Sequence, residues 1–157
     1  MPDQQSGSNR IPTEHLARAA GAIALAAVAV IHVIDLPSTL SATPLIGYGY
    51  FVLIAAALLG AALLLTVPEQ RVWVLVDLIA FGAITAYVLS RTTGLPTDRF
   101  DVGNWNCALG IAAISTETLV VLLAMWRMQP RRLLRTAAQS TDDSDASLFG
   151  APADFTS

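Results

Sequence analysis

Residues 45–67, LIGYGYFVLIAAALLGAALLLTV, decide the fold class of this chain because these 23 residues include no charged side chain. A helix of that length extends roughly 34 Å, slightly more than the hydrocarbon thickness of a bilayer. The run therefore predicts a transmembrane helix that crosses the membrane with some tilt. Its small residues, Ala55 to Ala57 and Gly60 to Ala62, would let a neighbouring helix approach closely.

Three further apolar segments accompany this run, and together they predict an all-α integral membrane protein. The segments span residues 17–36, 72–90 and 107–126, each near the length of about 20 residues that crosses a membrane. The composition agrees, since only 13% of the residues are charged, against about 25% in soluble domains. The single cysteine excludes an intrachain disulfide. No basic, aromatic-rich face indicates a nucleic-acid partner, so the bilayer is the expected partner, with a homo-oligomer or larger membrane complex as a further possibility.

The connections and the arginines predict how the spans are arranged. Residues 68–71 allow only a tight turn, so we expect an up-down-up-down four-helix bundle. Both termini are expected in the cytoplasm, in the cell (plasma) membrane, because this leaves only Arg91 and Arg99 of nine arginines outside. Aromatic rings would then mark the interfaces, Trp73 and Trp126 on the inner side and Trp105, Tyr48 and Tyr50 on the outer side.

The two polar ends of the chain are expected to be disordered tails around a membrane domain of residues 17–127. Residues 1–16 form the N-terminal tail, and residues 128–157 form a tail that turns from basic to acidic. A cleavable signal peptide is the alternative for the first span, because Arg18 precedes an apolar run. His32 and Asp35 interrupt that run, which favours a retained helix.

Residues 90–105, SRTTGLPTDRFDVGNW, form a polar loop that the arginine distribution places on the extracytoplasmic side. Gly94 and Pro96 indicate a turn within it. Arg91, at the end of the third span, could snorkel outward or reach inward to Asp35, Glu117 or a bound anion. Together with Asp101 and Trp105, Arg91 is therefore a candidate ligand-binding residue.

Glu117 is the strongest polar anomaly within the spans, since ten residues separate it from each end of the last span. It would lie roughly 15 Å from either surface, so it should face the bundle interior and be protonated, paired or hydrogen-bonded. It could hold two helices together through a hydrogen bond, bind a ligand, or carry protons. Asp77 in the third span is expected to be structural and to pair with Arg71 or Arg127.

His32 and Asp35 are three residues apart and should share one face of the first span. A carboxylate that orients an imidazole is common in metal and acid–base sites, although such a pair can also cap a helix end. Weak metal-ligand candidates are His32, Asp35 and Glu117. The sequence does not indicate a particular cofactor. Haem is weakly supported because His32 is the only histidine expected on the outer side.

The block Ser90-Arg91-Thr92-Thr93-Gly94-Leu95-Pro96 resembles one found in a poorly characterised family of small four-span integral membrane proteins of actinobacterial type. There a Ser-Arg-Thr-x-Gly-Leu-Pro run closes the third span, and an acidic residue and a glycine precede a final span that bears a glutamate. Asp101, Gly103 and Glu117 resemble those positions. The resemblance implies the four-span fold and its orientation, without a settled activity.

Three functions follow from these residues. The first is a binding or accessory protein with a small polar pocket on the extracytoplasmic side, for a small anion, a metal ion or a partner subunit. The second is a membrane-embedded enzyme in which His32, oriented by Asp35, acts as general base and Arg91 stabilises an oxyanion. The third is a proton- or ion-handling subunit with Glu117 as the carrier. We favour the first because no nucleophile–base pair or phosphate-binding loop is present.

Overall fold

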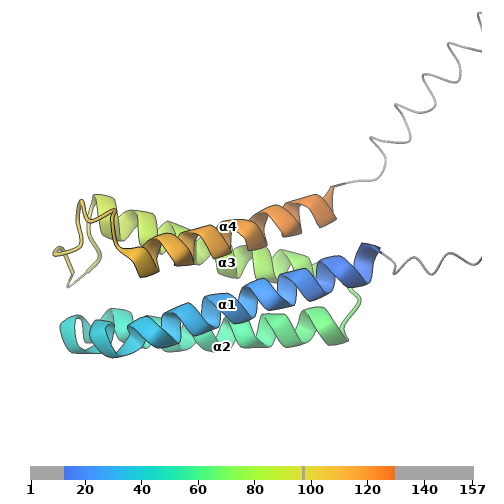
Figure 1. The fold of residues 1–157 in the computed structure, drawn as a ribbon, viewed down its shortest axis with the longest axis horizontal. Helices are drawn as coiled ribbons and strands as arrows, with labels where there is room; N and C mark the ends of the chain where they lie inside the picture. Colours follow the sequence, from blue (N-terminus) through green and yellow to red (C-terminus); the bar gives the residue numbers. More distant parts are fainter. Residues whose placement is uncertain (1–12, 97, 130–157) are drawn as a thin grey trace, which may run out of the picture.

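The computed structural model describes residues 13–96 and 98–129, and these residues form four helices (Figure 1). The helices are α1 (Thr13–Ala42), α2 (Pro44–Thr66), α3 (Gln70–Thr92) and α4 (Ala108–Met128). Each is long and apolar enough to cross a membrane, and no strand occurs among the described residues. The expected all-α class with four membrane-spanning helices is confirmed, and this is the architecture of a multi-pass membrane protein. The tails expected at residues 1–12 and 130–157 lie outside the described residues.

Helix α1 differs from the expectation at both ends. It begins at Thr13, inside the segment expected to be a tail, and it continues through Pro37 to Ala42 instead of ending at the proline. Pro37 has no N–H to donate, so a helix end was the simpler expectation. In the turns after Pro37, Ser38 Oγ donates to the Asp35 carbonyl and Ser41 Oγ to the Ser38 carbonyl, both at 2.8 Å.

Packing against α2 also favours the extension of α1. A Cβ atom on Gly47 would lie 2.5 Å from Leu40 Cδ2, so the leucine side chain occupies the space that the glycine leaves. Thr43 then connects the two helices with its backbone N–H donating to the Thr39 carbonyl at 2.8 Å. Burial of Leu40 against the next helix therefore outweighs the local preference of Pro37 for a helix end.

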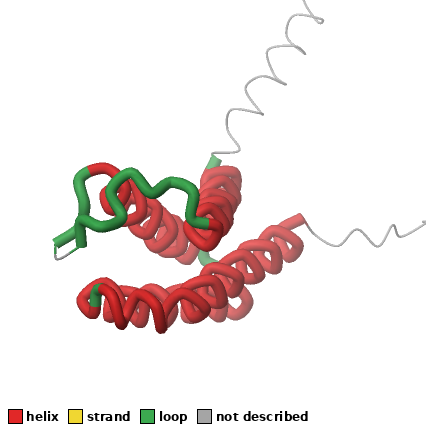
Figure 2. Tube along the Cα trace, turned by 60° about the vertical axis from the view of Figure 1, so that its left-hand side comes forward, coloured by secondary structure: helices red, strands yellow, loops and turns green. Residues whose placement is uncertain are grey.

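The four helices surround a central axis. Helix α1 packs against α2 and α4, and helix α3 packs against the same two helices, whereas the backbones of the diagonal pairs stay apart in the described part of the chain. The turn between α2 and α3 lies at one end of the molecule, and the α3–α4 loop lies at the other end, beside the connection from α1 to α2 (Figures 1 and 2). The molecule thus has a turn end and a loop end.

The apolar core occupies the turn end and the middle of the bundle. Each helix contributes at least one large apolar side chain that is at most 1% exposed, and these include Leu25, Leu64, Val76 and Val120. Trp73 is buried beside them, and a Cβ on Gly21 would lie 3.1 Å from its ring. The expected position of Trp73 at the inner interface is therefore wrong: its ring fills the core because Gly21 leaves room for it.

Arg18 closes the turn end from inside. Its guanidinium is buried and donates hydrogen bonds to the carbonyls of Leu64, at 2.6 Å, and of Val67. The last carbonyls of a helix have no partner within the helix, and a cation there also complements the helix dipole. Arg18 therefore caps the end of α2, a role that its position in an apolar run did not reveal.

The expected pairing of Asp77 is wrong as well. No described cation pairs with it, and its Oδ1 atom has no hydrogen-bond partner among the described residues. Arg127 Nη2 instead lies 3.5 Å from Glu14 Oε1. The reason lies in the extension of α1, because its first turn brings Glu14 to the arginine that the sequence assigned to Asp77.

Candidate functional site

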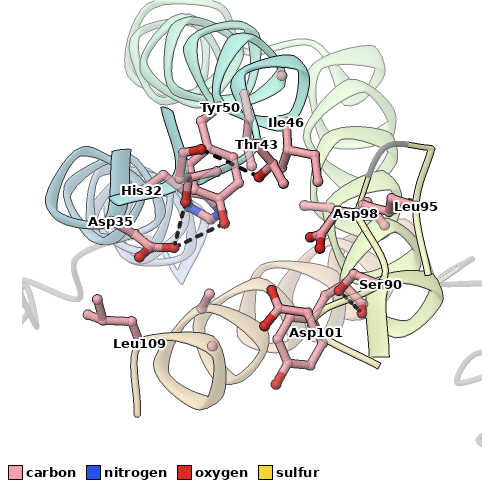
Figure 3. Close-up of a pocket in the computed structure, with 18 of the residues that line it drawn as sticks. His32, Asp35, Thr43, Ile46, Tyr50, Ser90, Leu95, Asp98, Asp101 and Leu109 are labelled. Carbon is pink, nitrogen blue, oxygen red and sulfur yellow. Dashed lines mark hydrogen bonds between the residues drawn. The ribbon is translucent and has the colours of Figure 1, made fainter. Parts of the chain in front are cut away.

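A cavity of about 940 Å³ opens in the loop-end half of the bundle. All four helices and the α3–α4 loop line it, mostly with apolar side chains and with a few polar groups at its edges (Figure 3). Among the sequence candidates, His32, Asp35, Arg91, Asp101 and Glu117 line the cavity. These five residues thus line one cavity, although they come from three different helices and a loop and form separate polar groups.

His32 and Glu117 form the innermost polar contact of this cavity. His32 Nε2 and Glu117 Oε1 are 3.8 Å apart, beyond hydrogen-bond distance, and the two residues are 7% and 1% exposed. His32 Nδ1 donates to the Val28 carbonyl at 2.9 Å. In the neutral form of this ring, Nε2, which faces Glu117, is the acceptor. Glu117 Oε2 has no hydrogen-bond partner among the described residues.

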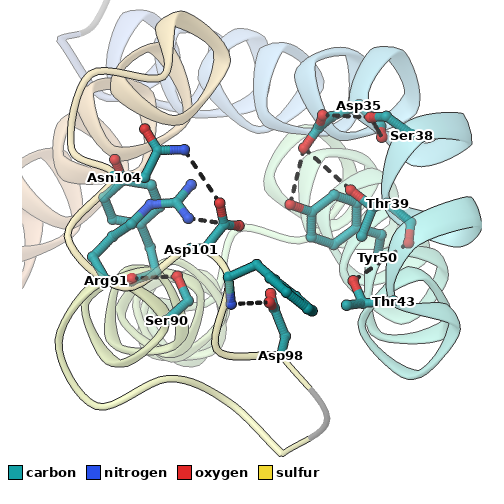
Figure 4. A network of polar contacts seen from close by, with 12 residues as sticks. Asp35, Ser38, Thr39, Thr43, Tyr50, Ser90, Arg91, Asp98, Asp101 and Asn104 are labelled. Atoms are coloured by element: carbon teal, nitrogen blue, oxygen red, sulfur yellow. Dashed lines mark hydrogen bonds and ion pairs between the residues drawn. The ribbon is translucent and has the colours of Figure 1, made fainter.

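Asp35 belongs to a second polar group, on α1 and α2. Its carboxylate accepts hydrogen bonds from Tyr50 at 3.1 Å, from Ser38 at 3.0 Å and from Thr39 at 3.4 Å (Figure 4). The Tyr50 ring also meets the His32 ring edge to face, with centroids 4.7 Å apart. The hypothesis that Asp35 orients the imidazole is therefore wrong: the Val28 carbonyl orients His32, and Asp35 holds Tyr50.

Arg91 and Asp101 form a third polar group, on the side of the cavity formed by α3 and the loop. Arg91 Nη1 lies 2.6 Å from Asp101 Oδ2 and forms an ion pair with it. The guanidinium also stacks over the Tyr87 ring, 4.9 Å from its centroid. Arg91 is only 8% exposed, so it does not snorkel outward, and its Nε and Nη1 have no hydrogen-bond partner among the described residues.

The polar loop is folded onto the end of α3. Gly94 and Gly103 have φ angles of 79° and 81°, values that residues with a Cβ atom rarely adopt. The Gly103 N–H donates a hydrogen bond to the Arg91 carbonyl at 2.9 Å. Leu95 and Asp98 exchange two backbone hydrogen bonds, and Asp98 Oδ1 accepts from the Phe100 N–H at 3.1 Å. These bonds place the carboxylates of Asp98 and Asp101 at the cavity, opposite Tyr50 (Figure 3).

Two expectations for this site are not met. Trp105 is 45% exposed and does not line the cavity; its ring packs edge to face on Tyr87, which does. The weak metal candidates also fail to group, because the described residues contain no set of three His, Cys, Asp or Glu side chains that could hold a metal ion. Asp35 is engaged by Tyr50, which leaves His32 and Glu117 as a pair.

Sequence reasoning missed Tyr50, Tyr87 and, as a lining residue, Asp98. Tyr50 was expected at the membrane surface, yet its hydroxyl turns inward to Asp35. A signal was present in the alternation Gly47-Tyr48-Gly49-Tyr50, since two tyrosines two residues apart lie on different helix faces and only one can face the surroundings. Tyr48 is indeed 64% exposed, whereas Tyr50 is half-buried.

Comparison with known proteins returned no relative: no protein-family model, no curated protein and no solved structure matches this chain. Function is therefore argued from the cavity and its side chains.

Proposed function

We propose that this protein is an up-down-up-down bundle in the cell membrane, with both termini in the cytoplasm, that binds a small molecule from the extracytoplasmic side. The orientation is supported by the described arginines, because Arg18, Arg71 and Arg127 lie at the turn end and only Arg91 and Arg99 lie at the loop end. Large apolar side chains on the outer surface, such as Ile23, Leu58 and Leu122, suit lipid contact. The block at residues 90–96 fits the proposed four-span family, because it closes α3 and begins the loop.

The observation that carries the binding proposal is the combination of an open space with a buried, unsatisfied carboxyl group. The cavity of about 940 Å³ is within the size range of ligand pockets, about 300–1,000 Å³. Such pockets are mostly apolar with a few convergent polar groups, as here. Glu117 lines this cavity, and an oxygen of a group that is 1% exposed lacks a partner among the described residues. A bound molecule can supply that partner.

The alternative functions have less support. A general base oriented by a carboxylate is not formed, since His32 is held by Val28. Arg91 forms an ion pair with Asp101, and an oxyanion of a substrate would have to compete with that carboxylate. Proton transfer toward the turn end would need a chain of polar groups beyond Glu117. The side chains that follow it on α4, Val120 and Ala124, are apolar and fully buried, and no hydrogen bond or ion pair among the described residues joins Asp77 of α3 to Glu117.

Filling the cavity should abolish binding without loss of the fold. A Cβ on Gly82, which lines the cavity, would meet no atom within 4 Å, so a Gly82→Phe side chain has room to occupy ligand space. We expect native mass spectrometry of wild-type protein, released from nanodiscs made with its own membranes, to detect a bound small molecule. We expect Gly82→Phe protein to lack that mass.

The matched control is Ala62→Phe, which adds the same side chain at an exposed α2 position outside the cavity. The control should retain the bound mass at the wild-type level. The binding proposal is wrong if wild-type protein carries no small molecule, or if Gly82→Phe and Ala62→Phe carry it equally.

A further inference from the structure

We propose that the ligand of this cavity is an organic cation, a protonated amine on an apolar body, whose ammonium group is bound by Glu117. This inference rests on the proposed binding function and adds the chemical class of the ligand. It also replaces the small anion, which was one of the three occupants that the sequence allowed.

The charges that face the cavity are predominantly negative. Four carboxyl side chains line it against a single guanidinium, and this set consists of Asp35, Asp98, Asp101, Glu117 and Arg91. Asp101, whose Oδ2 lies 2.6 Å from Arg91 Nη1, offsets the charge of the guanidinium, although Arg91 Nε and Nη1 have no hydrogen-bond partner among the described residues. The remaining three carboxyl groups would repel a small anion and attract a cation.

Glu117 is the carboxyl group that lacks a hydrogen-bond partner for one of its oxygens among the described residues. Asp35 accepts three side-chain hydrogen bonds, Asp98 accepts a backbone N–H, and Asp101 pairs with Arg91. Glu117 Oε2 accepts none from the described residues, although the residue is 1% exposed. A buried carboxylate without a partner is costly, and a ligand ammonium removes that cost with charge-assisted hydrogen bonds.

His32 supplies a second acceptor for the same ammonium group. Its Nε2 atom lies 3.8 Å from Glu117 Oε1, and one nitrogen can lie within hydrogen-bond distance, about 2.9 Å, of both atoms. An ammonium group carries several N–H donors, so it can satisfy both acceptors at once. A carboxylate ligand has no donor to offer either atom.

The surroundings suit the apolar body and the positive charge of such a molecule. Tyr50 and Tyr87 line the cavity, and their rings can face a cation. Between these polar groups, the lining from α2 and α3 consists of small and aliphatic side chains, among them Leu53, Ala56, Ile79 and Ala83. These side chains provide the apolar contact that anchors a hydrocarbon body.

A matched series of ligands tests the charge preference. We would measure the affinity of detergent-purified full-length protein for 1-aminoadamantane, 1-hydroxyadamantane and 1-adamantanecarboxylate, which share one hydrocarbon cage and differ in charge. Equilibrium dialysis against empty micelles corrects for partition into detergent. We expect the amine to bind at least about tenfold more tightly than the alcohol, the ratio that one charge-assisted hydrogen bond gives, and the carboxylate to bind least.

The Glu117→Gln variant assigns the preference to one residue. It keeps the size of the side chain and removes its charge, so the amine should fall to the affinity of the alcohol while the alcohol itself is unaffected. The inference is overturned if the amine shows no advantage, or if its advantage survives in Glu117→Gln. Equal binding of all three probes that is lost in Gly82→Phe would overturn the cation inference and leave the binding function intact. No binding of any probe would overturn the inference and count against the proposed function as well.

Discussion

The Arg18→Met variant is expected to lose about 2 kcal/mol of its free energy of unfolding. Methionine retains most of the buried aliphatic stem, so the change removes the two hydrogen bonds to the carbonyls of Leu64 and Val67. Those carbonyls lie at the end of α2, where the helix offers them no other partner. Reversible unfolding in mixed micelles, followed by circular dichroism, measures the difference.

Arg71→Met is the control for this prediction. Arg71 is an exposed arginine in the first turn of α3, so the same substitution there should change stability by less than about 0.5 kcal/mol. Equal effects of the two variants would show that loss of a cation near the turn end, and not the cap on α2, determines stability.

The Glu117→Met variant is expected to be more stable than the wild type, by about 1–2 kcal/mol. The substitution replaces a buried carboxyl group, which lacks a hydrogen-bond partner for Oε2 among the described residues, with an apolar side chain of similar length. If Glu117 lowers stability and also lines a cavity, then its role is to bind a ligand and not to stabilise the fold. The same unfolding assay measures the gain.

Thr118→Met is the control because Thr118 is the next residue along α4 and is exposed. It should change stability by less than about 0.5 kcal/mol. If Glu117→Met were instead destabilising while the control was neutral, the carboxyl group would be a structural link between helices and not an unsatisfied binding group.

The sequence predicted the helices well because membrane spans depend on length and apolar content, which are local properties. It placed α2, α3 and α4 within two residues of their observed ends. It failed at Pro37, where packing of Leu40 on Gly47 extends α1. That contact joins two helices, and no local pattern encodes it. The same limit applies to Trp73, whose burial depends on the absence of a side chain at Gly21.

The candidate site was predicted in part. The sequence identified His32, Asp35, Arg91, Asp101 and Glu117 because polar residues in or beside a membrane span are rare and face the interior. It could not assign their partners, because hydrogen bonds between helices depend on rotation and register. Asp35 therefore received the wrong partner, as did Arg91, which forms its ion pair with Asp101.

The central claim is that a water-accessible cavity reaches from the extracytoplasmic side toward Glu117, and cysteine labelling at Ala113 tests it most directly. Ala113 lines the cavity one helical turn before Glu117, and it is 8% exposed. The experiment uses a Cys107→Ser background, since Cys107 is the only native cysteine. Leu119→Cys, at an exposed position outside the cavity, is the control.

In intact cells, a membrane-impermeant cationic methanethiosulfonate reagent should modify Ala113→Cys, and Gly82→Phe should slow that reaction. Its anionic counterpart should react more slowly, because carboxylates dominate the cavity. Leu119→Cys should remain unmodified, since a charged reagent does not enter lipid. Failure of Ala113→Cys to react, or reaction only after the cells are permeabilised, would contradict an extracytoplasmic cavity that reaches Glu117.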